Sequence, residues 1–348
     1  MGKREILSRC AYGAGFFSLM RAIRAGSFKE VPVLAYHRVL DIPGDEAYPF
    51  DEWLVSCSVS EFEWQMKYVS RHYTPISFST LAGVLYHGEN LPKRPIIISF
   101  DDGYDDNYHN AYPVLKRLGI PATIFLSTGY IGTRDPFWFD WVVWMIKNSP
   151  LTMGELAAKI KEHADIIPDN EGDSIPTSSR EEFADALLEA MKVIPNQLRL
   201  ALISTIEEST TSSKEAAGYA FCKALGWDQV REMSNDGIEF GSHTVTHPIL
   251  TMLDDVSLSR ELEQSRKHIE QETGLPCTTL AYPVGRPFAF DDRVIQAAKS
   301  AGYTLGVSYI SGSNPVPGVD AFRLKRLHVE LETRRHDFVT ALAFQELV

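Results

Sequence analysis

The 348-residue chain contains few cysteines, and they lie far apart. Only four occur, at Cys10, Cys57, Cys222 and Cys277, and no two have the CxxC spacing. Small disulfide-linked domains and thiolate zinc sites both show characteristic cysteine spacings. The sequence therefore predicts neither, and we expect the four thiols to be buried or incidental.

An excess of positive charge is also missing. The chain carries 34 Lys and Arg against 46 Asp and Glu, which gives a formal net charge of −12, and its isoelectric point is near 5.3. Such a protein repels phosphate backbones, which argues against nucleic acid as a partner. The acidity does not exclude a neutral glycan.

Long hydrophobic runs are absent as well. Lys3, Arg4 and Arg9 precede an apolar stretch at residues 10–20, which is too short to cross a bilayer and is not followed by an A-x-A cleavage site. We expect residues 1–30 to form a helical segment that docks on the rest of the protein. A membrane-surface helix and a signal peptide are the alternatives. We accordingly expect a cytoplasmic protein, with peripheral membrane contact through residues 1–30 as the alternative.

Hydrophobic residues make up 44% of the chain and aromatic residues 11%, enough for a large folded core. Strand-like apolar segments alternate with helix-like segments. The strand-like segments are residues 31–36, 95–100, 122–127, 237–241 (leading into a strand), 278–282 and 303–307, and the helix-like ones are 60–73, 105–118, 254–273 and 292–300. Repeated β-then-α units predict a parallel sheet closed into a (β/α) barrel. For the first helix, Ser60 and Glu63 suggest a capping box.

Residues 134–236 interrupt this alternation. They begin with Trp138, Trp141 and Trp144 and contain helix-like stretches such as 181–194 and 197–206. We interpret them as a helical insertion within a barrel domain that spans 31–348. The tryptophans are expected either to attach this insertion to the core or to stack on a ligand. Because the loops at one end of such a barrel form the active site, the insertion is expected to shape substrate access.

Two acidic residues follow an apolar strand in the segment Ser99-Phe100-Asp101-Asp102-Gly103. Side chains of adjacent strand residues face opposite ways, so both carboxylates can enter one site only if the strand breaks there, and Gly103 allows that break. One carboxylate could then hold a cation while the other acts as a base. A solvated Asp-Gly turn is the alternative.

Two further segments contain candidate site residues. His243 and His247 lie four apart in the segment 241–248, and with one Asp they would make a two-His, one-carboxylate metal site with open positions. Two unrelated histidines are the alternative. In the segment 280–286, a strand runs into a loop through Tyr282 and Pro283, which by itself could be a plain loop.

The ordered motifs FDDG, HxxxHP and YPxG together resemble the polysaccharide deacetylase family, also called the NodB homology domain or carbohydrate esterase family 4. The resemblance covers roughly residues 31–133 and 237–330. It implies a distorted (β/α) barrel, here with a helical insertion, and hydrolysis of N-acetyl groups on a carbohydrate polymer or glycan precursor, such as an exopolysaccharide built of N-acetylhexosamine. It also implies a divalent metal ion, with zinc expected first and cobalt, nickel, manganese or iron as alternatives.

The resemblance also assigns roles to individual residues. By position in the motifs, Asp101 matches the catalytic base. The residues that match the metal ligands are Asp102, His243 and His247. Tyr282 matches the position whose backbone N–H helps to bind the oxyanion, with Pro283 beside it at the substrate. An N-acetylated glycan is thus the expected partner, while a metal-dependent amidase for non-sugar amides and an inactive carbohydrate-binding protein remain the competing functions.

The general acid and the arginine beside the base are not fixed by the motifs. The opening segment VLAYHRV resembles the branch of biofilm poly-N-acetylglucosamine deacetylases, which predicts His37 as the acid, and we expect a nearby carboxylate to keep its imidazole protonated at neutral pH. His328, in the segment FRLKRLHVE, is the rival. The arginine could be Arg286, Arg323 or Arg326.

Overall fold

The computed structural model describes residues 30–42, 48–162, 179–210 and 223–344. Apart from Glu30, the helical segment predicted for residues 1–30 lies outside these described residues. Cys57 and Cys277 are buried free thiols. Among the described helices, none is both long and apolar enough to cross a membrane.

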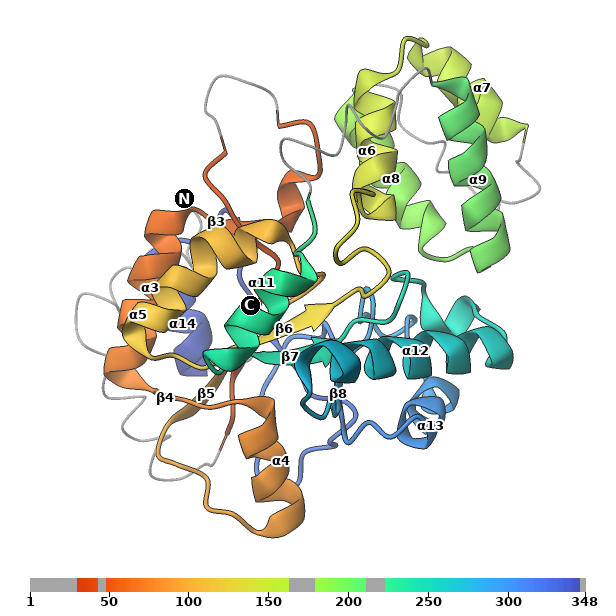
Figure 1. Cartoon of the computed structure of the whole chain (residues 1–348). Helices are drawn as coiled ribbons and strands as arrows, with labels where there is room; N and C mark the ends of the chain where they lie inside the picture. Colours follow the sequence, from red (N-terminus) through yellow and green to blue (C-terminus); the bar gives the residue numbers. More distant parts are fainter. Residues whose placement is uncertain (1–29, 43–47, 163–178, 211–222, 345–348) are drawn as a thin grey trace.

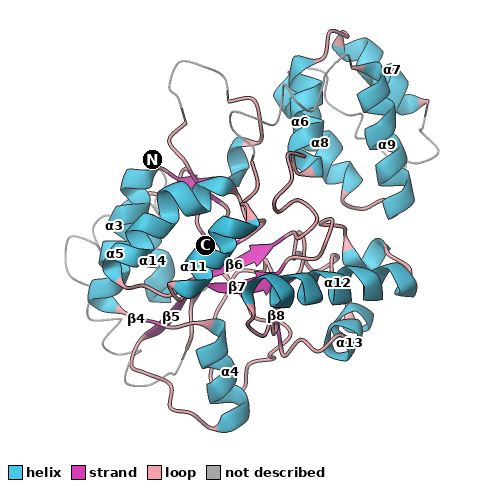
Figure 2. Ribbon diagram, viewed as in Figure 1, coloured by secondary structure: helices cyan, strands magenta, loops and turns pink. Residues whose placement is uncertain are grey.

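Within the described residues, eight parallel strands form the main sheet, seven of them in the order β10-β1-β5-β6-β7-β8-β9. Strands β5 to β8 of this sheet are labelled in Figures 1 and 2. They are β1 (Val33–Tyr36), β5 (Pro95–Phe100), β6 (Thr123–Leu126), β7 (Glu239–Ser242), β8 (Thr279–Ala281), β9 (Leu305–Val307) and β10 (Leu327–His328), with β4 (Thr74–Pro75) beside β5. A second, two-stranded sheet pairs β2 (Arg38–Val39) with β3 (Val55–Cys57).

The main sheet curls until its two edges meet at residues 324–328. Leu324 bridges Val307 of β9, and the backbone N–H of Ser308 donates to the Leu324 carbonyl at 2.8 Å. Three residues later the same segment becomes β10 and pairs with β1. This arrangement confirms the (β/α) barrel predicted from the alternation of strands and helices, in the distorted form that the family resemblance implies.

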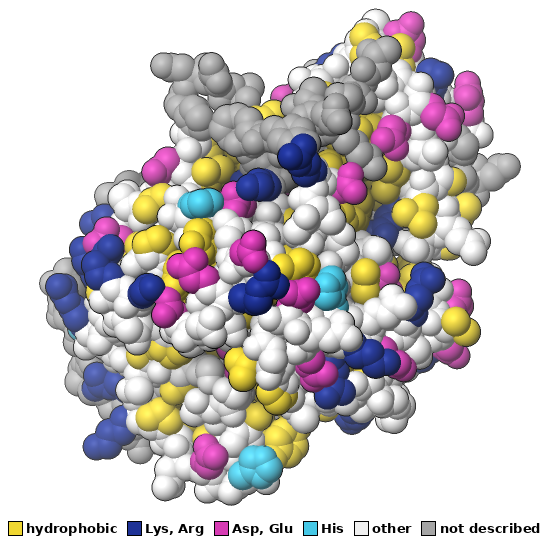
Figure 3. Space-filling view, in the orientation of Figure 1, with side chains coloured by type: hydrophobic (Ala, Val, Ile, Leu, Met, Phe, Trp, Pro, Cys, Tyr) yellow, Lys and Arg dark blue, Asp and Glu magenta, His cyan; other side chains and the backbone are white. Residues whose placement is uncertain are grey.

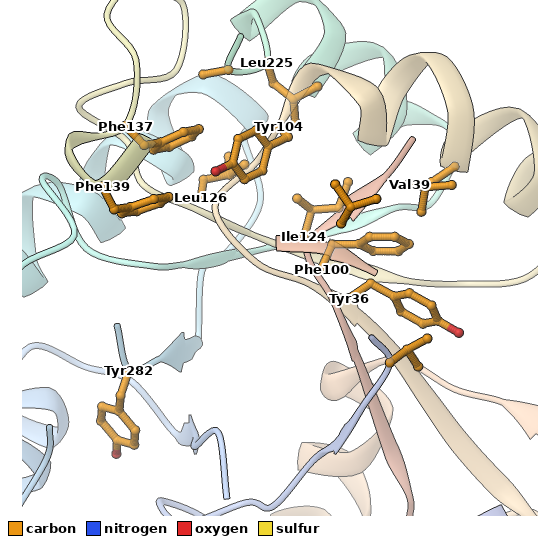
Figure 4. Packing of buried hydrophobic residues seen from close by; sticks show 14 of the residues in the cluster. Tyr36, Val39, Phe100, Tyr104, Ile124, Leu126, Phe137, Phe139, Leu225 and Tyr282 are labelled. Atoms are coloured by element: carbon orange, nitrogen blue, oxygen red, sulfur yellow. The ribbon is translucent and has the colours of Figure 1, made fainter. Parts of the chain in front are cut away.

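Helices surround the sheet (Figure 2). They are α3 (Val59–His72), α4 (Phe78–His87), α5 (Tyr112–Leu118), α11 (Trp227–Asn235), α12 (Asp255–Thr273), α13 (Asp292–Ser300) and α14 (Arg335–Phe344). Strand residues alternate between two apolar clusters. Ile97 faces the barrel interior, whereas Ile96, Ile98 and Phe100 pack in the larger core that contains the helices (Figure 4).

The helix ends follow local sequence signals, with one correction. Helix α12 begins after its cap Asp254 and ends at Gly274, whose φ of 70° suits glycine. Helix α3, however, begins at Val59, one residue before the predicted segment, and its cap lies two residues before the predicted one. Ser58, not Ser60, is the cap, because its side chain accepts from the backbone N–H of Glu61 while its own backbone stays extended.

Four helices form a lobe above the sheet (Figure 1): α6 (Trp138–Asn148), α7 (Met153–Lys161), α8 (Arg180–Met191) and α9 (Asn196–Ser209). Helix α6 packs on α8 and α9, and α7 on α9. Trp141 is buried and stacks on Trp144 within α6, so this pair packs the lobe itself. Helix α11, later in the same stretch, packs instead on α12 of the barrel.

Charges of both signs are interspersed on the face of the molecule drawn in Figure 3. Acidic and basic side chains alternate there over both the barrel and the lobe. No broad basic patch lies on the described part of this face.

Candidate active site

The barrel interior places one set of side chains at the carboxyl end of the strands. Because strand side chains alternate, the inward series of β5 continues from Ile97 through Ser99 to Asp101. The Asp101 N–H still donates to the Tyr36 carbonyl at 2.9 Å, so the strand spacing persists to this residue. The same alternation in neighbouring strands brings further residues to this end of the barrel. They are His37, His243, Tyr309 and Arg326.

Asp101 forms an ion pair with Arg326 in the interior. The guanidinium donates from Nη1 to Oδ1 at 2.7 Å and from Nη2 to Oδ2 at 2.8 Å, and Arg326 is fully buried. Burial raises the pKa of Asp101, but the charges of Arg326 and His243 lower it, and the net shift is downward. Asp101 is therefore held as a carboxylate. Among the three candidate arginines, Arg326 is the one beside Asp101.

Asp102 leaves the strand in a different direction. Its φ is 72°, the left-handed region that residues other than glycine rarely adopt, and Gly103 follows with φ 86°. The break that Gly103 was predicted to permit is thus shared by both residues. Burial and the neighbouring charges of Asp101 and Asp140 raise the pKa of Asp102 well above its usual value. A bound cation would relieve this penalty.

The side chains of Asp102, His243 and His247 converge in the interior. Asp102 Oδ1 lies 3.7 Å from His243 Nε2 and 3.5 Å from His247 Nε2, and one ligand atom of each residue lies within 4.8 Å of the others. All three residues are buried. His243 Nδ1 lies 2.8 Å from the Ala281 carbonyl, an arrangement that places the proton on Nδ1 and leaves Nε2 free as a ligand.

These residues fit a divalent metal ion. Asp102 Oδ1 has no hydrogen-bond partner although it is buried, and such an atom normally has one. Ligands about 2.0–2.1 Å from one zinc ion lie roughly 3–3.5 Å apart, close to the separations seen here. One carboxylate and two imidazoles also match the donor set of metal sites that keep positions open for substrate.

Strained backbone conformations cluster at the candidate metal site. Of the five non-glycine residues with positive φ in the described chain, four belong to this site. They are Asp102, Thr244, His247 and Val284. Each such conformation costs about 1–3 kcal/mol and persists only where the surrounding structure enforces it, which happens most often at functional sites.

The two candidate acids occupy different positions. His37 Nε2 lies 3.9 Å from Asp101 Oδ2, whereas His328 stacks flat on Tyr309, with ring centroids 3.6 Å apart. Burial, only partly offset by Asp101, lowers the pKa of His37 to about 4. The expectation of a protonated His37 at neutral pH is therefore wrong, because desolvation outweighs the carboxylate.

A cavity of about 410 Å³ opens onto these residues. Its inner wall contains the predicted residues His37, Asp101, Asp102, His243 and His247. The outer walls come from the lobe and from the segment before β3. They are lined by Asp51, Trp53, Leu54, Trp138, Phe139, Asp185, Leu188, Glu189 and Lys192, together with Val284, Arg286, Tyr309 and Glu330. His328 is not among the lining residues.

The predicted roles of Tyr282 and Pro283 need correction. The Tyr282 N–H donates to the Val307 carbonyl at 3.0 Å, and its ring stacks on Phe290 and does not line the cavity. That N–H is thus used in the sheet. Pro283 is buried and does not line the cavity. Val284, two residues after Tyr282, does line it.

Comparisons with known proteins agree with this fold. Over 91% of this chain and 99% of the other, the structure superposes on that of the Streptococcus pyogenes deacetylase PplD in complex with acetate, with a TM-score of 0.58 and 17% identity. It superposes on IcaB from Ammonifex degensii over 90% and 97%, with a TM-score of 0.56 and 19% identity. At these identities the likeness establishes the fold alone.

Two curated relatives are similar in sequence. YxkH of Bacillus subtilis, assigned as a polysaccharide deacetylase, is 22% identical over 285 residues, which are 82% of this chain and 66% of that protein. The poly-beta-1,6-N-acetyl-D-glucosamine N-deacetylase of Staphylococcus aureus is 44% identical over 82 residues, 23% of this chain. The latter match spans only 28% of the relative's own length.

A family model gives the broadest assignment. The model for polysaccharide deacetylase matches residues 88–306, a stretch that begins before β5 and ends in β9. This stretch contains Asp101, Asp102, His243 and His247 and covers more than half of the chain. The chain belongs to the polysaccharide deacetylase family.

Proposed function

We propose that this protein is a metal-dependent hydrolase that removes N-acetyl groups from a glycan of the exopolysaccharide type. The observation that carries the proposal is the buried set Asp102, His243 and His247, in which Asp102 Oδ1 has no hydrogen-bond partner, beside a carboxylate that Arg326 keeps ionised. The complete set argues against an inactive carbohydrate-binding protein. The Staphylococcus aureus relative, named for poly-beta-1,6-N-acetyl-D-glucosamine, supports an N-acetylglucosamine polymer as the substrate.

Different residues of the cavity perform different steps of the proposed reaction. Asp102, His243 and His247 would hold the metal ion, which when bound would polarise the acetamide carbonyl and lower the pKa of the attacking water. Asp101 accepts a proton from that water, with both of its oxygens oriented by Arg326. The water oxygen bonds to the carbonyl carbon, and the bond from that carbon to nitrogen breaks.

His37 completes the proton balance. With a pKa of about 4 its ring is neutral at rest near pH 7, so the proton that it donates must first reach it. Asp101 lies 3.9 Å away and holds the proton taken from water. His37 then delivers that proton to the leaving nitrogen, and the products are acetate and a free amine on the sugar. We propose the Val284 N–H as the backbone donor to the oxyanion.

The test compares substrates and metal content with the full chain. Purified protein would be incubated with a β-1,6-linked N-acetylglucosamine pentamer and with small non-sugar amides, before and after chelation and after zinc is added back. We expect acetate and free amine in equal amounts from the glycan, their loss on chelation and their return with zinc. Hydrolysis of the small amides alone would favour the amidase, and full activity without metal would refute metal dependence.

A further inference from the structure

Two side chains of the lobe donate hydrogen bonds to the backbone carbonyl of His247. Its carbonyl accepts from Trp138 Nε1 of α6 at 3.0 Å and from Arg199 Nη1 of α9 at 3.3 Å. Both donors are buried, with 7% of Trp138 and 2% of Arg199 exposed. These contacts join the lobe directly to a proposed metal ligand.

The ring of His247 lacks the usual support of a ligating histidine. Such a ring normally donates its second N–H to a carboxylate or carbonyl, which fixes its orientation. His243 has that contact through Ala281, but His247 Nδ1 has no partner in the structure. Its edge contact with Phe139, 5.0 Å between centroids, also comes from α6. Apart from an edge contact with the His243 ring, 4.8 Å between centroids, the orientation of His247 therefore depends on its backbone and on the lobe.

The backbone of His247 needs such support because its φ is 54°. The barrel restrains the residues before it. Thr244 Oγ1 accepts from the His247 N–H at 3.1 Å, and Glu261 accepts from the N–H groups of Val245 and Thr246. Among the described contacts, only Trp138 and Arg199 donate hydrogen bonds to the His247 carbonyl.

Arg199 is an unusual residue to bury for packing alone. Its guanidinium makes no direct ion pair with a described carboxylate, although the charge of Glu261 acts on it from farther away, and its Nε has no hydrogen-bond partner. Besides His247 it contacts the side-chain oxygen of Asn196 at 2.6 Å and lies over the Trp138 ring at 4.3 Å. A buried cation without a directly bonded counter-ion destabilises a fold, and an apolar side chain would serve packing better.

We infer that Arg199 and Trp138 are positioning residues of the metal site, so that the helical lobe takes part in holding the metal through His247. The inference rests on the proposed metal site and goes beyond it by assigning this role to residues outside the family motifs. It also implies that movement of α6, which with α8 borders the cavity, or movement of α9 changes metal affinity.

The test measures zinc affinity on the metal-free full chain by competition with a chromophoric chelator. Arg199→Met keeps the apolar stem and removes the donors, and Trp138→Phe keeps the ring and removes the N–H. We expect the zinc dissociation constant to rise roughly 10–100-fold for Arg199→Met and about 3–10-fold for Trp138→Phe. Saturating zinc should restore most of the turnover of both variants, and the KM of Arg199→Met, whose side chain does not line the cavity, should stay unchanged, which a general loss of structure would not allow.

Arg180→Met is the matched control. Arg180 also donates to two carbonyls, those of Ile146 and Leu151, but both lie within the lobe. The zinc affinity of the Arg180→Met variant should stay within about 2-fold of wild type. Unchanged affinity in Arg199→Met and Trp138→Phe, or an equal loss in Arg180→Met, would overturn the inference while leaving the proposed function intact. Failure of the wild-type chain to bind zinc through Asp102 would refute both.

Discussion

Asp101 and Asp102 are neighbours in sequence but lie in opposite electrostatic settings. Asp101 continues the inward side of β5 and receives the guanidinium of Arg326, which lowers its pKa. Asp102 turns away through a positive φ, has no arginine partner and has a raised pKa. Environments that separate two carboxylates in this way allow them to perform different roles.

The different roles of the two carboxylates predict the behaviour of Asp101→Asn. The amide cannot take a proton from water, so turnover should fall by roughly 10²- to 10⁴-fold. Zinc content, measured by elemental analysis beside kcat, should stay at the wild-type level because Asp102 and both histidines remain. Loss of zinc together with turnover would show that the two carboxylates have exchanged roles.

His37 and His328 give a second prediction at this scale. His37→Ala should lower turnover on an N-acetylated glycan by about 10²-fold or more, since the leaving amine then lacks its proton donor. An activated acetate ester needs little protonation and should lose less than about 10-fold. His328→Ala should be mild on both substrates, because His328 does not line the cavity. A glycan-selective loss in His328→Ala alone would assign the acid to that residue.

The inward-facing positions of the site can be predicted from strand alternation. The site residues that were predicted wrongly lie where strands end and loops begin. Residues 99 and 101, or 324 and 326, lie two apart, so their side chains share one side of the sheet. The sequence alone could not identify Arg326 among three arginines, because the pairing of 324–328 with both β9 and β1 is a tertiary event. Tyr282 faces outward by the same rule, since Ala281 faces the interior.

At the scale of elements, helix α12 fixes the loop that carries both histidines. Glu261, buried on α12, accepts from the N–H groups of Val245 and Thr246 at 2.7 and 3.0 Å and from Thr246 Oγ1 at 2.7 Å. These bonds have a charged acceptor, which makes each stronger than a neutral one. The helix thereby orients a loop that has no regular structure of its own.

Glu261→Ala should therefore lower the free energy of unfolding by roughly 2–4 kcal/mol, because the loop N–H groups lose a buried acceptor. Denaturant unfolding of the metal-free chain measures this change. Glu263→Ala on the same helix removes only a partly exposed ion pair with Lys267 and should change stability by less than about 0.5 kcal/mol. Equal effects of the two substitutions would contradict the assignment.

Element positions were predictable where caps and apolar segments agree. Gly119 and Gly274 end helices as expected, both in the left-handed region. The start of α3 was misplaced because Ser58 and Ser60 carry the same capping signal, and only the extended backbone at Ser58 decides between them. Strand β10 has two residues, too few for a periodic pattern, and it exists because β1 lies beside it.

At the scale of the whole molecule, the lobe and the barrel meet across the cavity with acidic groups on both sides. Asp51 precedes the short 3₁₀ helix Glu52–Leu54 of the barrel, and Asp185 lies on α8 of the lobe. Burial raises the pKa of Asp51 to about 6 from 3.8, with further contributions from the charges of Asp140 and Asp185. The folded molecule therefore favours the protonated form of this carboxyl more than the unfolded chain does.

This difference sets a pH dependence of stability. Because the pKa of Asp51 is higher in the folded state, its contribution is most favourable below about pH 4 and is lost as pH rises from about 4 to 6. Asp51→Asn keeps an oxygen to accept the Trp53 N–H that now donates to Asp51, but it cannot ionise. The variant should match wild type near pH 4 and be more stable by roughly 1–2 kcal/mol at pH 8, as measured by unfolding of the metal-free chain at both values. Asp228→Asn, whose side chain is 97% exposed, should give no such pH-dependent gain. A constant difference between Asp51→Asn and wild type at both pH values would mean that the carboxyl does not titrate with folding, and that the lobe and barrel approach each other without mutual repulsion at this point.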